Sequence, residues 1–100
     1  MATLVLKVKL VGVLRKLAES SEVRLKTGKE SLNISEAIWR LCRKIARPEF
    51  EQAVIDPSSR TVGAHIIVLV NDRDISVLHG LETEIGSNDV LTLVPVAHGG

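Results

Sequence analysis

Apolar residues recur at every second position in two early stretches of the chain, which predicts two β-strands. In the first stretch, residues 4–11, these positions are Leu4, Leu6, Val8 and Leu10. A period of two is typical of a strand with one buried face. Residues 22–27 alternate in the same way. We expect the two strands to form an antiparallel hairpin, joined by a surface connection over residues 14–21.

The hydrophobic period changes to that of a helix over residues 31–46. Asn33 is a suitable N-cap, and Glu36 lies three residues later, as in a capping box. Pro48 disfavours helix at the residue before it. We expect one amphipathic helix and a further short helical turn over residues 50–55. The apolar positions of the main helix are Ile34, Ala37, Ile38, Leu41, Cys42 and Ile45.

The second half of the chain returns to strand patterns. Residues 65–70 are almost continuously apolar, which suits a central strand covered on both faces. After a turn at Asn71 and Asp72, a short strand is expected over residues 74–77, and a last strand over residues 90–96. The sequence thus predicts an α+β domain with a mixed four- to five-stranded sheet. One main helix packs across this sheet, and the first and last strands are neighbours.

Composition narrows the functional classes. The chain has 100 residues, 45% of them hydrophobic, which is enough for one domain with one core. The net charge of +1 gives no reason to expect binding to nucleic acid or to a membrane surface. Cys42 is the only cysteine, so an internal disulfide is excluded and no metal site is expected. No apolar stretch approaches the ~20 residues that span a bilayer, and we expect a cytoplasmic protein.

The end of the chain is its most unusual feature. An apolar run over residues 91–97 is followed by His98, Gly99 and Gly100. Glycine has no Cβ, so the backbone there is thin enough to enter a site that a side chain would block. We therefore expect residues 1–96 to form the domain and residues 97–100 a flexible tail, with the α-carboxylate of Gly100 as the reacting group.

Three segments carry a resemblance to a known family. They are residues 35–41 (Ser-Glu-Ala-Ile-Trp-Arg-Leu), residues 68–75 (Val-Leu-Val-Asn-Asp-Arg-Asp-Ile) and the tail. The chain resembles the ubiquitin-like β-grasp sulfur carriers and modifiers, which include the ubiquitin-related modifier, the archaeal small modifiers and the small subunit of molybdopterin synthase. Residues 94–97 (Val-Pro-Val-Ala) are similar to the molybdopterin synthase subunit, whereas His98, Gly99 and Gly100 look like the end of the ubiquitin-related modifier.

This resemblance implies that the protein is a substrate of other enzymes and is not itself an enzyme. A ubiquitin-activating-type enzyme would use ATP to adenylate Gly100, and the chain would bind no cofactor itself. A sulfur donor protein would then give a thiocarboxylate for a tRNA thiolation enzyme, or lysines of target proteins would be conjugated. One alternative is the small subunit of molybdopterin synthase, with the large subunit as its partner. Another is an interaction module that is never activated.

The remaining expectations concern individual residues. Val96, Ala97, His98 and Gly99 would thread into the partner. His65 and His79 are expected to be structural, and the basic residues after position 39 to form a solvated helix end and not an RNA site. The expected docking surface consists of Leu69, Leu91, Leu93 and Val94.

Overall fold

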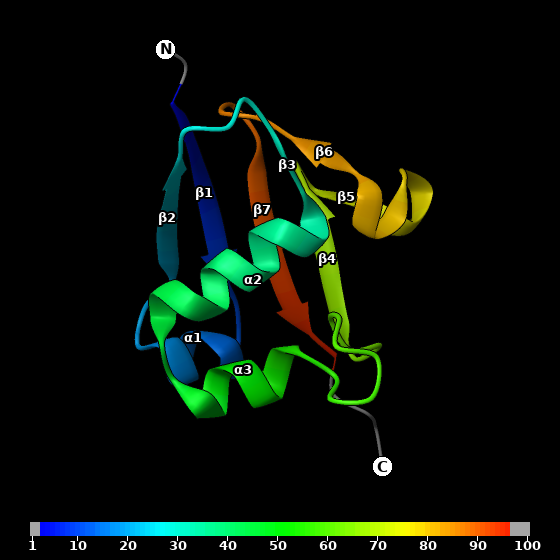
Figure 1. The fold of residues 1–100 in the computed structure, drawn as a ribbon. Coiled ribbons are helices and arrows are strands. Elements are labelled where there is room, and N and C mark those ends of the chain that lie inside the picture. Colours follow the sequence, from blue (N-terminus) through cyan, green and yellow to red (C-terminus); the bar gives the residue numbers. More distant parts are fainter. Residues whose placement is uncertain (1–2, 97–100) are drawn as a thin grey trace.

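The first and last strands lie side by side in the sheet (Figure 1). The computed structural model describes residues 3–96. Strand β1 (Leu4–Leu10) runs parallel to β7 (Val90–Pro95), with Val8 beside Leu91 and Leu10 beside Leu93. The strand order is β2-β1-β7-β4-β5, so β7 occupies the centre. The other strands of this sheet are β2 (Glu22–Thr27), β4 (Ile66–Val70) and β5 (Arg73–Asp74).

The helices cover one face of this sheet. Helix α2 (Ile34–Ile45) crosses it, and the short helices α1 (Val13–Ala18) and α3 (Pro48–Val54) lie at one end (Figure 1). Strands β3 (Leu32–Asn33) and β6 (Glu84–Ile85) form a separate two-stranded sheet. Two 3-10 helices, η1 (Ile75–Val77) and η2 (Gly80–Glu82), connect β5 to β6. The predicted β-grasp architecture, with a mixed sheet and one main helix, is confirmed.

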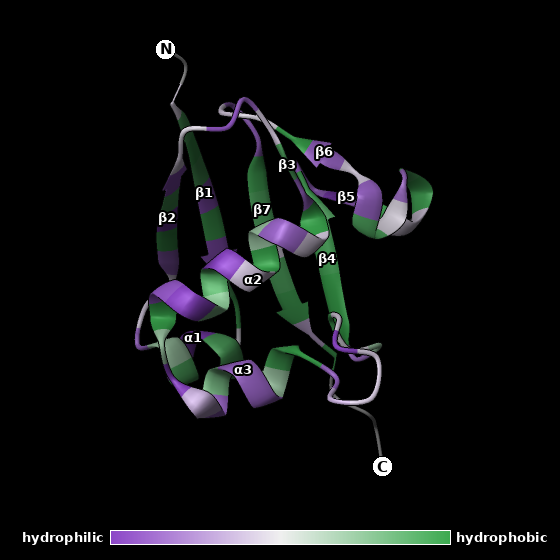
Figure 2. Cartoon of the chain, in the orientation of Figure 1, coloured by the Kyte–Doolittle hydropathy of each residue, from purple (hydrophilic) through white to green (hydrophobic). Residues whose placement is uncertain are grey.

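Local chemistry explains where α2 begins and what it buries. The side chain of Asn33 accepts a hydrogen bond of 2.8 Å from the backbone N–H of Glu36, as the capping pattern predicts. The apolar face of α2 packs on the inner face of the sheet, where Leu6, Leu91 and Leu93 are fully buried. Strands β4 and β7 are hydrophobic along most of their length, whereas β2 is largely hydrophilic (Figure 2). The core is aliphatic apart from Phe50 and Cys42.

The expected surface connection over residues 14–21 is wrong in its first half. Residues 13–18 form α1, and Leu14 is fully buried. Gly12 takes a φ of 62°, which turns the chain so that Leu14, Leu17 and Ala18 reach the core on one helical face. A helix of six residues is too short to show its period clearly in the sequence.

The apolar segment 65–70 also differs from the prediction. Strand β4 is next to the edge strand β5, and its residues alternate between buried and half-buried. Ile67 and Leu69 lie on the face that none of the helices in the described residues covers, so only one face of β4 is fully buried. The short strand expected over residues 74–77 is shorter, because β5 ends at Asp74 and η1 follows.

The C-cap of α2 gives a test of the local account. Ala46 ends the helix in the left-handed region, at a φ of 54°, where a Cβ is unfavourable. Ala46→Gly should therefore raise the free energy of unfolding by about 0.5–1 kcal/mol. Ala53→Gly, inside α3, is the matched control and should lower it by about 0.5–1 kcal/mol. Urea unfolding followed by Trp39 fluorescence measures the free energy of unfolding of both variants. A destabilised Ala46→Gly variant would contradict the left-handed conformation of this cap.

The buried thiol gives a second test. Burial, together with the charge of Glu51, raises the pKa of Cys42 to about 11. The folded thiol keeps its proton to higher pH than the unfolded one, so this group costs stability as the pH rises from about 9 toward 11. At pH 8 the native protein should resist iodoacetamide until urea unfolds it. The reactive control is a Val13→Cys, Cys42→Ser variant, whose thiol lies at an exposed site. If the unmodified protein and this variant, both folded, were alkylated at equal rates, the burial of Cys42 would be refuted.

Candidate functional site

The point where the chain leaves the domain is held by the backbone. The Val96 N–H donates a hydrogen bond of 2.8 Å to the carbonyl oxygen of His65, the residue that precedes β4. Ile66 is paired with Pro95 in the sheet register. The backbone is therefore anchored as far as Val96, although the side chain of this residue is 40% exposed. Ala97, His98, Gly99 and Gly100 lie outside the described residues, and the predictions made for them stay predictions.

His65 connects this exit point to α3. Its Nε2 atom lies 2.9 Å from the carbonyl oxygen of Ala53. A Cβ at Gly63 would come within 2.7 Å of the imidazole Cε1 atom, so a larger residue at this position would displace the ring. The structural role expected for His65 is confirmed. His79 is exposed, and its backbone N–H donates to the Thr83 hydroxyl at 3.0 Å.

Apolar side chains surround the exit point. Gly12 packs against Pro95, since a Cβ at Gly12 would lie 3.3 Å from Cγ of that proline. Val11 and Val13, on either side of Gly12, are 43% and 51% exposed. The end of β7 lies at the same end of the sheet as α1 and α3 (Figure 1). Residues 11–13 were not singled out from the sequence, although Val11 continues the outward positions of β1.

The uncovered face of the sheet corrects the expected docking surface. Leu91 and Leu93 are fully buried against the core, so neither can contact a partner. Leu69 and Val94 lie on the uncovered face and are half-buried. Ile67 stands opposite Val94 in the register and belongs to the same face. We call Ile67, Leu69 and Val94 the apolar stripe. Because β4 and β7 are apolar at almost every position, the sequence alone does not show which of their side chains face the core.

On β1 and β2, the uncovered face of the sheet carries charged residues. Glu22 lies 3.9 Å from Lys7 and 3.5 Å from Arg24, and these groups are partly exposed. Lys9 is exposed one pleat further along β1. The uncovered face is therefore apolar on β4 and β7 and mainly cationic on β1 and β2. Such a surface suits a partner with apolar and acidic groups.

The part of the chain that the structure describes offers little reactive chemistry of its own. Within residues 3–96, no three His, Cys, Asp or Glu side chains come together as metal ligands. The Cys42 thiol is buried and carries the raised pKa described above, which makes it a poor nucleophile. None of the helices in these residues is long and apolar enough to cross a membrane.

Comparison with solved structures shows several similar proteins. The small archaeal modifier protein 1 of Methanosarcina acetivorans is 25% identical, with a TM-score of 0.81 and 100% of each chain covered. The corresponding protein of Haloferax volcanii is also 25% identical, with a TM-score of 0.79, and the match covers 99% of this chain and 100% of that one. Urm1 of Trypanosoma brucei, at 20% identity, shares the fold with a TM-score of 0.69, over 100% of this chain and 99% of that one.

Sequence comparison agrees with this likeness. No curated protein matches the chain. The family model of Urm1, the ubiquitin related modifier, matches residues 5–100, which include the two terminal glycines. The chain therefore belongs to the ubiquitin-related modifier (Urm1) family of ubiquitin-like β-grasp modifiers and sulfur carriers.

Proposed function

We propose that this protein carries an activated carboxylate at Gly100, which an ATP-dependent adenylating enzyme forms and a sulfur donor converts into a thiocarboxylate. The observation that supports this most directly is the anchoring of the chain at Val96. The backbone is hydrogen-bonded to the body at that residue, and four residues follow it. Fully extended, these residues reach about 13–14 Å. That length is enough for Gly100 to enter a site inside a partner while the domain stays on its surface.

The chemistry needs two steps, because a carboxylate is a poor acceptor for nucleophiles. A carboxylate oxygen of Gly100 first attacks the α-phosphorus of ATP, and pyrophosphate leaves. A sulfide-equivalent sulfur then attacks the carbonyl carbon of the acyl-adenylate, and AMP leaves. The product thiocarboxylate is the sulfur source for tRNA thiolation. A lysine amine in place of sulfur would give an isopeptide bond with a target protein, and both outcomes share the first step.

The protein is the substrate in this scheme and the partner supplies the catalysis. The apolar stripe and the cations beside it are the surface that we propose the adenylating enzyme contacts, because this surface is on the side of the sheet that no helix covers. Pro95 and Val96 extend from this surface to the tail. Docking there would hold the domain while Ala97, His98 and Gly99 pass into the active site.

The glycine tail can be tested by adding bulk. Gly99→Val should lower the rate of ATP–pyrophosphate exchange with the adenylating enzyme by about 100-fold, because a branched side chain displaces the carboxylate from the α-phosphate. Unfolding by urea should be unchanged. Gly28→Val is the matched control, since a Cβ at Gly28 meets no atom within 4 Å. A Gly99→Val protein that is activated at the normal rate would refute the threading of the tail.

The docking surface can be tested separately. Leu69→Asp should raise KM for activation about tenfold with little change in kcat, because it places a charge in the apolar stripe and removes binding energy made before the chemistry. The matched control is Val77→Asp, because Val77 is 68% exposed on η1 and lies off the stripe. Equal KM values for the two variants would place the contact elsewhere.

The identity of the stable partner distinguishes the proposed function from the alternative, a subunit of molybdopterin synthase. Affinity purification of the intact protein from its own cells should recover an adenylating enzyme and tRNA thiolation components. A stable one-to-one complex with a molybdopterin synthase large subunit would assign the protein to that pathway instead. The first step at Gly100 is common to both, so this experiment decides the destination of the sulfur.

A further inference from the structure

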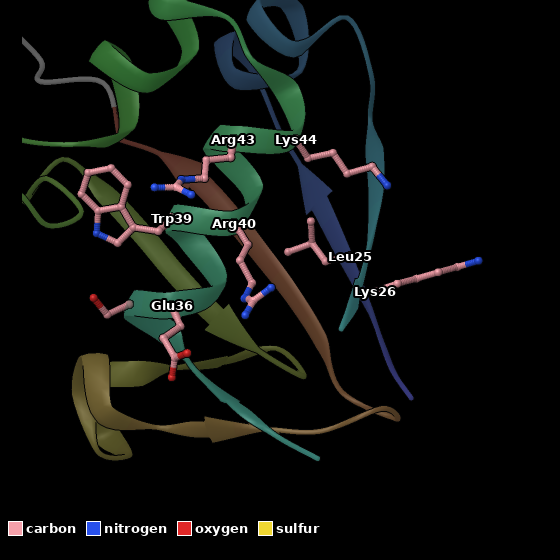
Figure 3. A pocket seen from close by; sticks show the side chains of 8 residues that line it. Leu25, Lys26, Glu36, Trp39, Arg40, Arg43 and Lys44 are labelled. Carbon is pink, nitrogen blue, oxygen red and sulfur yellow. The ribbon is translucent and has the colours of Figure 1, made fainter. Parts of the chain in front are cut away.

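A groove lies between helix α2 and the edge strand β2, on the helix-covered side of the sheet. Its volume is about 610 Å³. Leu25 is part of its floor, and Figure 3 shows Arg40 and Lys44 extending from α2 on the side of β2, with Trp39 on the other side of the helix. The groove is thus separate from the apolar stripe and from the exit of the tail. Its lining residues are Leu25, Lys26, Ser35, Glu36, Trp39, Arg40, Arg43 and Lys44.

The groove has a strong excess of positive charge. Half of its lining residues are cations, and its one carboxylate, Glu36, is paired with Lys29 at 2.6 Å. The hydrogen bond from Lys29 lowers the pKa of Glu36 and keeps this carboxyl ionised in its pair. Within residues 3–96, neither Arg40 nor Arg43 forms an ion pair. The groove therefore favours a negatively charged ligand.

The strand at the border of the groove has a free edge. Within residues 3–96, strand β2 pairs only with β1. The Leu10 N–H donates to the Ser21 carbonyl at 2.9 Å, and in the same register Val23 and Leu25 face Val8 and Leu6. Hydrogen-bonded and non-hydrogen-bonded pairs alternate in an antiparallel ladder. The N–H and C=O groups of the intervening residues, Glu22, Arg24 and Lys26, therefore point away from β1.

Side chains already occupy part of this edge. Ser20 Oγ bonds both backbone groups of Glu22, with its hydroxyl donating to the carbonyl at 2.7 Å. Lys44 Nζ donates to the Arg24 carbonyl at 2.7 Å. In the described chain, no group bonds the N–H or C=O of Lys26. A lysine that covers an edge strand protects it against unwanted pairing. Because the Lys44 side chain is exposed, its ammonium group can exchange the Arg24 carbonyl for a carboxylate of a ligand.

We propose that this groove binds an extended, acidic segment of a partner protein, which adds to the sheet as a further strand beside β2. Backbone hydrogen bonds at Arg24 and Lys26 would supply part of the affinity, as in other cases of strand addition. Cross-strand neighbours set the sequence of the segment. Its residue opposite Leu25 would be acidic and face Arg40 and Lys44 of α2, and those opposite Arg24 and Lys26 would be β-branched. The expected ligand alternates acidic and β-branched residues.

A protein segment fits this groove better than RNA. Single-stranded RNA is held on successive aromatic side chains, whereas Trp39 is the only aromatic residue of the groove. Figure 3 shows its indole on the side of α2 away from β2. The edge of β2 offers backbone donors and acceptors at strand spacing, which a peptide matches and a nucleotide chain does not.

The test uses a capped peptide, acetyl-Glu-Val-Glu-Ile-Glu-Val-Glu-amide, and the full-length protein. Two-dimensional amide NMR should show shifts at residues 24–27 and along α2. Hydrogen exchange at the Lys26 amide should slow at least tenfold when peptide is saturating, because this amide gains an acceptor. The Leu25 amide, already paired with β1, should not change. Arg40→Glu should weaken binding about tenfold or more, and the matched charge reversal Arg73→Glu, on the opposite edge strand, should leave it unchanged.

Three results would overturn the proposal. They are no binding at millimolar peptide, binding without slower exchange at Lys26, and equal binding of a peptide with the same composition but all glutamates at one end. Tighter binding of a single-stranded oligouridylate than of the peptide would assign the groove to nucleic acid instead. None of these measurements involves Gly100. Their outcome therefore does not depend on whether the proposed activation of the tail is correct.

Discussion

The pairing of β7 with β1 on one side and β4 on the other is the constraint on which the rest of the structure depends. Because β7 is bonded on both sides and buries Leu91 and Leu93, its position in the domain is fixed. The Val96–His65 hydrogen bond extends this fixed position to the last residue before the tail. Any reaction at Gly100 thus takes place at the end of four residues that leave a rigid point. In the proposed reaction the domain would contribute by position, because Pro95 packs against Gly12 and the Val96 N–H is bonded to His65.

The sequence was sufficient wherever one local pattern determined one structure. The alternation over residues 4–10 predicted β1 and its inward side chains, and Asn33 with Glu36 predicted the start of α2. It was insufficient where burial depends on partners distant in the chain. Residues 66–70 and 90–95 are apolar on both faces, so their composition does not reveal which side chains face α2; the register with β1 decides that Leu91 is buried and Val94 is not. Helix α1 escaped prediction because six residues show too little of a helical period.

The same sheet separates two surfaces of different chemistry. The uncovered face combines the apolar stripe with the cations of β1 and β2, and it leads to the exit of the tail. The groove beside α2 lies on the opposite side, and its cations border the free edge of β2. Under the two proposals, a partner that acts on Gly100 would contact side chains of the uncovered face, whereas a partner that adds a strand would contact the groove and the backbone edge of β2. Together the two proposals predict that one partner can hold the protein while another modifies its terminus.

The most direct test of the account is the intact mass of the full-length protein after incubation with its adenylating enzyme, ATP and a sulfide source. We expect the mass to rise by the difference between one sulfur and one oxygen atom, and fragmentation to place this change at Gly100. Omission of ATP should abolish the change, because the carboxylate then keeps both oxygens. An unchanged mass, under conditions in which the same enzyme activates another family member, would contradict the claim that Gly100 is the reacting group.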